Sequence, residues 1–162
     1  MKSFLKGFVY AGKGIIHTLA NERNMRFHLC VMAYMFGILT IYDFFEISRA
    51  EYGILLALCA LVLSLETVNT AIERVVNLAS PDYHPLAGQA KDAAAGAVLI
   101  AAIFSVIAGI VIMWQPEAFV KMADYYLSHP GNLIILIISL CVSLVFIFLP
   151  SYLKKKKEQK NG

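Results

Sequence analysis

Four long runs of apolar residues alternate with segments that hold most of the charged side chains. The runs cover residues 29–42, 52–65, 93–114 and 133–149. The third is about 22 residues long, which matches the roughly 20 residues that an α-helix needs to cross the core of a bilayer. The others reach that length when flanking residues that snorkel or pack within a bundle are included. The pattern predicts membrane spans at about 27–47, 50–78, 87–114 and 132–150.

Residues 2–21 have an amphipathic pattern that predicts a helix lying on the membrane surface. Apolar side chains share one side of a helical wheel, and basic or polar side chains share the other. A simple anchor to anionic membrane lipids and a functional role both fit this pattern. Gly7, Gly12 and Gly14 favour function, since they leave room for a neighbouring helix or ligand. A charged segment of this length before the first apolar run excludes a cleaved signal peptide.

The predicted fold class is therefore an all-α membrane protein with an N-terminal amphipathic surface helix. A three-helix transmembrane core within residues 1–114 follows this helix. Residues 115–162 add an outer loop, an extra C-terminal transmembrane helix and a basic tail. This last helix has no ionisable residue and is predicted to pack or anchor without a catalytic role. Pro150 and the lysine cluster after it are predicted to end the helix.

Composition and charge support a multi-pass protein of the cell membrane. The chain is 59% hydrophobic and only 15% charged, which is more apolar than a soluble domain. Twelve of the fourteen Lys and Arg residues fall in segments 1–26, 73–91 and 154–160. Because short cytoplasmic segments hold an excess of positive charge, both termini are predicted to be cytoplasmic. The net charge of +3 thus reflects topology and does not support binding to nucleic acid.

A stripe of polar residues follows the second apolar run. Its members lie on one face of a helix by their spacing: Glu66, Asn69, Thr70, Glu73 and Asn77. Measured from Tyr52, Glu66 lies roughly 21 Å along the helix and Glu73 roughly 31 Å, against a hydrocarbon core of about 30 Å. A carboxylate at the depth of Glu66 costs several kcal/mol unless it is paired, protonated or facing water. Polar contacts between helices would need only Asn69 and Thr70, so the two acids favour a functional site.

The acids suit a divalent cation that is bound together with phosphate. Glu22, at the start of the first span, is predicted at the depth of Glu73, and Mg²⁺ is commonly held by two carboxylates plus phosphate oxygens. Residues that could bind a nucleotide lie nearby: Lys6, Lys13 and Lys91 for its phosphates, and Tyr83 and His84 for its base. Together they predict a nucleotide site at the membrane surface, with Glu66 reaching below it.

Three segments resemble a known family in their order and spacing. They are "YAGKGIIHTLANERNMRFH", "ETVNTAIE" and "DYHPLAGQAKDAAAGAV", and they are similar to the small integral-membrane diacylglycerol kinases and undecaprenol kinases of bacteria. The resemblance covers roughly residues 3–114. It implies a homotrimer that transfers the γ-phosphate of ATP, with Mg²⁺, to a lipid alcohol. "NERN" and "DAAAGAV" look more like the undecaprenol kinase branch, with diacylglycerol as the alternative acceptor.

The resemblance also implies roles for particular residues. Glu66 matches the catalytic base, and Glu22 and Glu73 match the carboxylates that hold the metal with ATP. Asn69, Lys91 and Asp92 match positions at the nucleotide site. The positions around the nucleotide are matched by Tyr10, Asp82, Tyr83, His84, Pro85 and Leu86. Ser3 stands where a basic residue is frequent, so that Lys2 or Lys6 is the expected substitute.

Two alternative functions have to be weighed against the kinase. Asn77 stands where the family more often has Asp, which leaves open a non-catalytic lipid-binding relative. A channel would need polar residues across the whole membrane. The far half of every predicted span is apolar, so the polar stripe predicts a one-sided pocket and favours the kinase.

Overall fold

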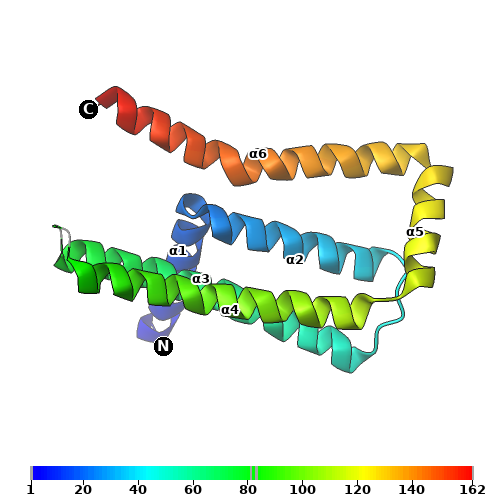
Figure 1. Ribbon diagram of the computed structural model, residues 1–162, viewed down its shortest axis with the longest axis horizontal. Coiled ribbons are helices and arrows are strands. Elements are labelled where there is room, and N and C mark those ends of the chain that lie inside the picture. The colour runs from blue at the N-terminus through cyan, green and yellow to red at the C-terminus, as the bar shows by residue number, and fades with distance from the viewer. Residues whose placement is uncertain (1, 81, 83, 162) are drawn as a thin grey trace.

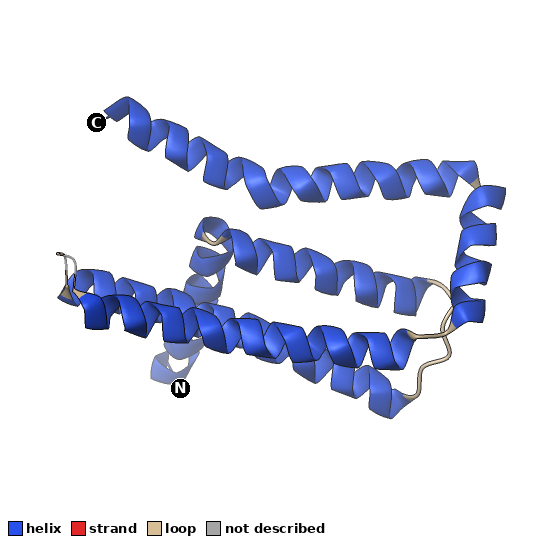
Figure 2. Ribbon diagram, viewed as in Figure 1, coloured by secondary structure: helices blue, strands red, loops and turns tan. Residues whose placement is uncertain are grey.

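The computed structural model describes residues 2–80, 82 and 84–161 (Figures 1 and 2). Its helices are α1 (Lys2–Asn21), α2 (Arg23–Ile41), α3 (Arg49–Ala79), α4 (Pro85–Met113), α5 (Pro116–Ser128) and α6 (Pro130–Asn161). The described residues contain no strand, which confirms the predicted all-α class. Four segments are long and apolar enough to cross a membrane: α2, α3, α4 and residues Pro130–Pro150 of α6.

The helix boundaries differ from the predicted ones at three places. Helix α2 begins and ends earlier than predicted, because Glu22 is its extended N-cap and the backbone becomes extended again at Tyr42. The segment predicted as an outer loop contains α5, which starts with Pro116 in the first turn, where the missing N–H costs no hydrogen bond. Helix α6 does not end at Pro150 but continues to Asn161.

Pro150 bends α6 where the sequence predicts that it ends the helix. A proline inside a helix has no N–H to offer the carbonyl four residues earlier, here that of Phe146, and its ring pushes that carbonyl aside. The usual result is a kink. Figure 1 shows α6 changing direction in its C-terminal part, beside the start of α2.

The helices pack in an order that leaves α6 next to α2. Helices α3 and α4 form the most extensive pair, α2 packs between α3 and α6, and α1 contacts α2, α3 and α6 (Figure 1). Within the described residues, the backbone of α6 does not come close to that of α3 or α4. The extra C-terminal helix therefore lies against the first span of the core.

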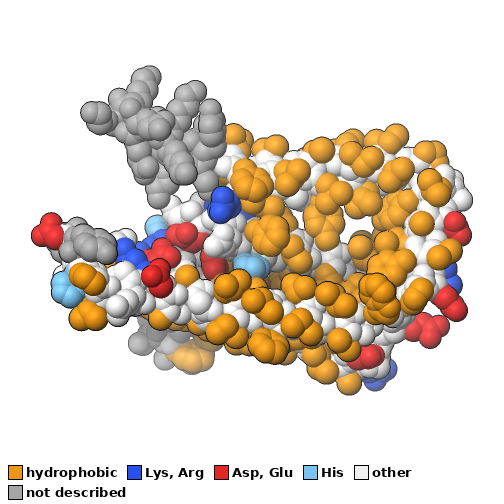
Figure 3. Space-filling model, viewed as in Figure 1, with side chains coloured by type: hydrophobic (Ala, Val, Ile, Leu, Met, Phe, Trp, Pro, Cys, Tyr) orange, Lys and Arg blue, Asp and Glu red, His pale blue; other side chains and the backbone are white. Residues whose placement is uncertain are grey.

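Few apolar side chains are buried within this single chain. The buried ones are Met25, Leu55, Val62, Val98, Ala101, Ala118 and Ile147. Figure 3 shows the remainder as a broad hydrophobic band between two polar ends, one near α5 and one near the α1–α2 turn. We call these the α5 end and the α1 end. A band of this kind is what a lipid bilayer or neighbouring subunits cover.

Aromatic side chains and one glutamine organise the α5 end. Gln115 joins two connections, since its side chain accepts from the N–H of Glu46 and donates to the carbonyl of Glu46, both at 3.0 Å. Rings of Tyr42, Tyr125 and Tyr126 pack edge to face nearby. Burial, aided by a hydrogen bond with Tyr42 and by the neighbouring phenols, raises the pKa of Tyr126 to about 12. Such aromatic clusters are typical of membrane–water interfaces.

Candidate active site at the α1 end

Three carboxylates from two helices meet at the α1 end. Glu22 is placed by the turn between α1 and α2, where its N–H donates to the carbonyl of Thr18 at 2.8 Å. Glu66 and Glu73 lie on the same stripe of α3, and Glu66 is only 2% exposed. Both Glu22 and Glu73 are close enough to Glu66 for their charges to act on its carboxylate. From helix depth, the sequence predicted only that Glu22 and Glu73 lie at the same level, with Glu66 deeper.

Asn24, which is not among the site residues predicted from the sequence, contacts the buried acid Glu66 directly. Its side chain forms a hydrogen bond with the carboxylate of Glu66. The amide is a neutral donor, so it holds one carboxylate oxygen in place without cancelling the charge. Asn24 belongs to the "NERN" turn. The sequence feature that could have identified Asn24 is its position, since it is a polar residue two positions after Glu22 at the start of an apolar span.

Asn69 has a buried oxygen that no described residue satisfies. Its Nδ2 donates to Oε1 of Glu73 at 3.1 Å. With the nitrogen of the amide facing Glu73, its oxygen lies on the other side of the group. The opposite atom, Oδ1, is buried and has no partner among the described residues. A buried acceptor left in this state costs about 1–3 kcal/mol, which points to a ligand that supplies a cation or a donor.

Together these oxygens fit a Mg²⁺ ion that the protein holds jointly with a bound phosphate. They fit less well a metal ion that is held by protein side chains alone. Carboxylate and amide oxygens are the ligands that a hard cation prefers, and three acids in one pocket repel each other until a cation joins them. Within the described part of the chain, no group of three or more His, Cys, Asp or Glu side chains is arranged to hold a metal alone. The fit is therefore to a cation that also takes oxygens from a bound phosphate.

Thr70, the remaining buried member of the stripe, is satisfied by its own helix. Its hydroxyl donates to the carbonyl of Glu66 at 2.9 Å. This bond leaves the residue with a local role in α3.

Asn77 and Lys91 join α3 to α4 at the same end of the molecule. Lys91 Nζ donates to Oδ1 of Asn77 at 2.6 Å. Asp92, the next residue on α4, is exposed. Lys91 thus lies one helical turn beyond Glu73, while the structure gives Asp92 no contact with the three acids.

The connection between α3 and α4 is built from residues that were predicted to surround a nucleotide. His84 is the N-cap of α4, and its Nδ1 accepts from the N–H of Leu86 at 3.2 Å. Pro85 takes the first helical position, and the carbonyl of Asp82 accepts from the hydroxyl of Ser80 at 3.0 Å. The side chains of Asp82, His84, Pro85 and Leu86 are exposed, so they are accessible to a ligand. Tyr83 lies outside the described residues.

The predicted contacts from α1 are exposed on that helix. The side chains of Lys6, Tyr10 and Lys13 are all exposed, and Lys13 Nζ is 6.0 Å from the centre of the Tyr10 ring. Among the described residues, no hydrogen bond joins these three side chains to the acids. The structure therefore brings together the acids and Asn69, and leaves the α1 residues at a separate surface.

A family comparison now bears on this geometry. The sequence model of the family "Prokaryotic diacylglycerol kinase" matches residues 9–113, which contain every acid of the site. The chain belongs to this family. It is accordingly a membrane-embedded lipid kinase, as the three motifs predicted. Residues 114–162, with α5 and α6, lie outside the matched segment.

Individual relatives in this family have two different names. The undecaprenol kinase of Bacillus subtilis (strain 168) is 43% identical over 112 residues, which cover 69% of this chain and 89% of that protein. The diacylglycerol kinase of Synechocystis is 37% identical over 115 residues, covering 70% of this chain and 64% of that protein. The diacylglycerol kinase of Escherichia coli is 34% identical over 111 residues, covering 68% and 88%. The kinase class is common to all three, and the lipid is not.

Proposed function

We propose that this protein phosphorylates undecaprenol with ATP and Mg²⁺ at the cytoplasmic face of the cell membrane. The observation that carries the proposal is the cluster in which buried Glu66 lies beside Glu22 and Glu73, with Asn69 bonded to Glu73. The 43% identity to an undecaprenol kinase favours this lipid alcohol. Diacylglycerol is the second candidate, because relatives with that name match over a similar length.

Each side chain has a distinct task in this proposal. Glu66 accepts the proton of the lipid hydroxyl, and Asn24 keeps its carboxylate oriented. The hydroxyl oxygen then forms a bond to the γ-phosphorus, the bond between this phosphorus and the oxygen of ADP breaks, and ADP leaves. Glu22, Glu73 and the free oxygen of Asn69 would hold Mg²⁺, which neutralises charge on the phosphates when it is bound.

The depth of the residues suits substrates that arrive from two phases. Glu66 is buried among the helices on a span, and in this proposal the lipid hydroxyl reaches it from the bilayer. Lys91 and the exposed residues of the α3–α4 connection lie further towards the α1 end, where a nucleotide arrives from water. Lys6, Tyr10, Lys13 and Asp92 remain candidates for nucleotide contacts on the same side.

We also propose that the α1 end is cytoplasmic and that the protein is a homotrimer. The positive charges of segments 1–26 and 73–91 belong to α1, the start of α2 and the helix ends beside the α3–α4 connection, which lie at the α1 end (Figure 1), and such charges favour the cytoplasm. The apolar surface left open on every span gives neighbouring subunits room to pack. A reporter fused after residue 162 is expected to be active inside the cell, and activity only outside would reverse the orientation.

The proposed reaction is tested with purified protein in mixed micelles that contain undecaprenol or diacylglycerol. With MgATP, we expect phosphorylated undecaprenol to form faster than phosphatidic acid at matched lipid fractions. Glu66→Gln should abolish most of this turnover, whereas Glu117→Gln on α5, an acid at the opposite end, should not. Equal or reversed preference would assign the protein to diacylglycerol, and no lipid-dependent transfer would contradict the kinase.

A further inference from the structure

Arg26 is the most deeply buried charged side chain of the described residues, at 1% exposure. It lies on α2, one turn after Glu22, and the charge of Glu22 acts on its guanidinium. Burial of a charge at a membrane span is costly unless the group is paired and hydrogen-bonded. The contacts of Arg26 therefore explain why the chain places it there.

Hydrogen bonds from Arg26 join three helices. Its Nη1 donates to the carbonyls of Leu19 and Ala20 in the last turn of α1, both at 3.0 Å. Its Nε and Nη2 donate to the carbonyl of Ile147 in α6, at 3.2 and 3.0 Å. The last carbonyls of a helix lack intrahelical partners and attract cations. One planar side chain thus connects the end of α1, the start of α2 and the middle of α6.

Pro150 accounts for the bend of α6 at this contact. Without an N–H at position 150, the carbonyl of Phe146 loses its helical donor, and the kink tilts the carbonyls of this turn out of the helix axis. In a membrane such carbonyls need donors from neighbouring helices. Arg26 supplies donors to the adjacent carbonyl, that of Ile147. Arg26 on α2 thus donates hydrogen bonds at the turn of α6 where Pro150 removes a backbone donor.

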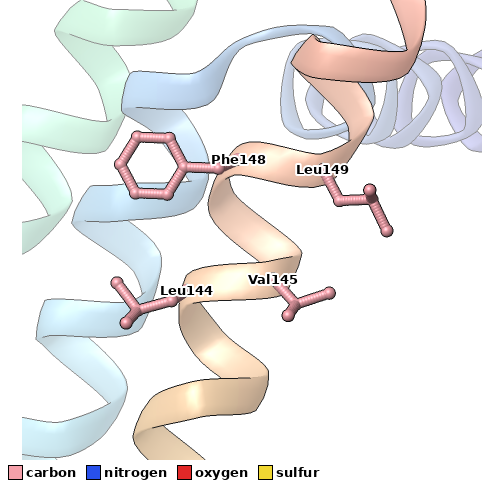
Figure 4. A pocket seen from close by; sticks show the side chains of 4 residues that line it. All are labelled: Leu144, Val145, Phe148 and Leu149. Carbon is pink, nitrogen blue, oxygen red and sulfur yellow. The ribbon is translucent and has the colours of Figure 1, made fainter.

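Further contacts fix the register of α6 against α2. The hydroxyl of Tyr34 contacts those of Ser139 and Ser143 at 3.1 and 2.9 Å. The guanidinium carbon of Arg23 lies 5.8 Å from the centre of the Phe148 ring. Figure 4 shows Phe148 on the opposite side of α6 from Leu149. Helix α6 is therefore docked by specific polar contacts along several turns.

We propose that α6 positions the magnesium-binding turn of the kinase through the contact between Arg26 and the carbonyl of Ile147. The turn held by Arg26 carries Glu22, which is proposed to hold Mg²⁺, and Asn24, which bonds to Glu66. Helix α6 lies outside the segment shared with the family, so this is an addition of this chain. The sequence predicts only packing or anchoring for this helix. The inference rests on the proposed role of Glu22 in holding Mg²⁺.

Arginine is required at this position by geometry as well as by charge. Its planar fork reaches the Ile147 carbonyl with two N–H groups while a third nitrogen reaches α1. A lysine keeps the positive charge beside Glu22 but offers a single point donor. Arg26 is thus a positioning residue, and its loss should loosen the turn without removing any group that contacts substrate.

The test compares Pro150→Ala with Pro130→Ala in the full-length protein. Pro150→Ala restores the missing N–H, straightens α6 and withdraws the Ile147 carbonyl. Pro130 stands at the start of the same helix, where no intrahelical bond is lost. Turnover of undecaprenol is titrated with MgATP, and hydrogen exchange of amides 18–26 is measured by mass spectrometry in the same micelles.

We expect Pro150→Ala to raise KM for MgATP about fivefold and to change kcat less than about twofold, as for one lost charged hydrogen bond. Amides 18–26 should exchange faster, and Arg26→Lys should show the same split between KM and kcat. Pro130→Ala should match the wild type in both measurements. Faster exchange with an unchanged KM would overturn the proposal, since α6 would then serve stability alone, and so would unchanged exchange.

A parallel variant separates failure of this inference from failure of the proposed function. Glu22→Gln should raise the Mg²⁺ concentration needed for half-maximal turnover. If it does not, the metal role proposed for Glu22 is wrong. If it does while Pro150→Ala leaves KM unchanged, the kinase assignment stands and the positioning role of α6 is wrong.

Discussion

Lys91 on α4 donates a hydrogen bond to Asn77 on α3, with 2.6 Å between Nζ and Oδ1. The contact joins the two most closely packed spans at the α1 end, one helical turn beyond Glu73. From the resemblance to the family, an aspartate is the residue expected at this position. In this chain the ammonium of Lys91 donates to the neutral amide of Asn77. With an aspartate at position 77, the same contact would be an ion pair.

Asn77→Asp should convert this hydrogen bond into an ion pair. Asn77 is exposed, so the gain in stability should be small, about 0.5 kcal/mol. Activity at limiting Mg²⁺ should stay the same or rise, because the added charge lies near the proposed metal site. Unfolding in micelles and a magnesium titration measure the two effects. The double variant with Lys91→Gln should lose the stability gain, and a clear fall in magnesium affinity for Asn77→Asp would contradict this placement.

Asn69 should be needed for metal binding because of its free Oδ1. Asn69→Leu keeps the size of the side chain but removes this oxygen and the donor to Glu73. We expect the Mg²⁺ concentration for half-maximal turnover to rise about tenfold, which corresponds to about 1.4 kcal/mol. Asn132→Leu, at the start of α6, is the matched control and should leave the magnesium titration unchanged. An unaltered titration in Asn69→Leu would show that Oδ1 faces no cation.

Tyr126 should make the protein sensitive to alkaline pH. Its pKa of about 12, above the ordinary value of 10, means that the folded state holds the phenolic proton more tightly than the unfolded state. This contribution is complete below pH 10 and is lost as the pH rises through 12. Tyr126→Phe should remove part of the fall in stability over this window, whereas Tyr52→Phe should not. Unfolding followed by circular dichroism at several pH values checks this, and parallel curves for both variants would refute it.

Much of the fold could be predicted because each helix carries its own signal. Helix α1 has the predicted bounds, and the depth of Glu66 followed from counting residues along α3. The contacts between Asn24 and Glu66 and between Arg26 and Ile147 could not be predicted, since they depend on how α1, α2 and α6 pack. Pro150 illustrates the limit. From its local effect on the backbone, a proline is expected to end the helix. Here the helix bends and continues, because Arg26 on another helix donates hydrogen bonds at the bend.

Glu66→Gln should lower turnover strongly while nucleotide binding survives. Glutamine preserves the size of the side chain and its hydrogen bond with Asn24, but it cannot take the proton of the lipid hydroxyl. General-base catalysis contributes about 10²–10⁴-fold, so kcat should fall by at least about 100-fold. Binding of MgATP to the purified variant in lipid, followed by calorimetry, should stay within about threefold of the wild type.

Glu73→Gln should instead weaken magnesium-dependent nucleotide binding. Glu73 is less buried than Glu66 and lies nearer the α1 end, and its carboxylate accepts from Asn69, which presents the free oxygen to the same pocket. Removing one charged metal ligand should raise the dissociation constant for MgATP, and excess Mg²⁺ should restore part of the turnover, because the lost affinity is recovered by mass action. Excess Mg²⁺ should leave Glu66→Gln inactive. If Glu66→Gln lost nucleotide binding while Glu73→Gln bound normally and failed only in turnover, the two roles would have to be exchanged.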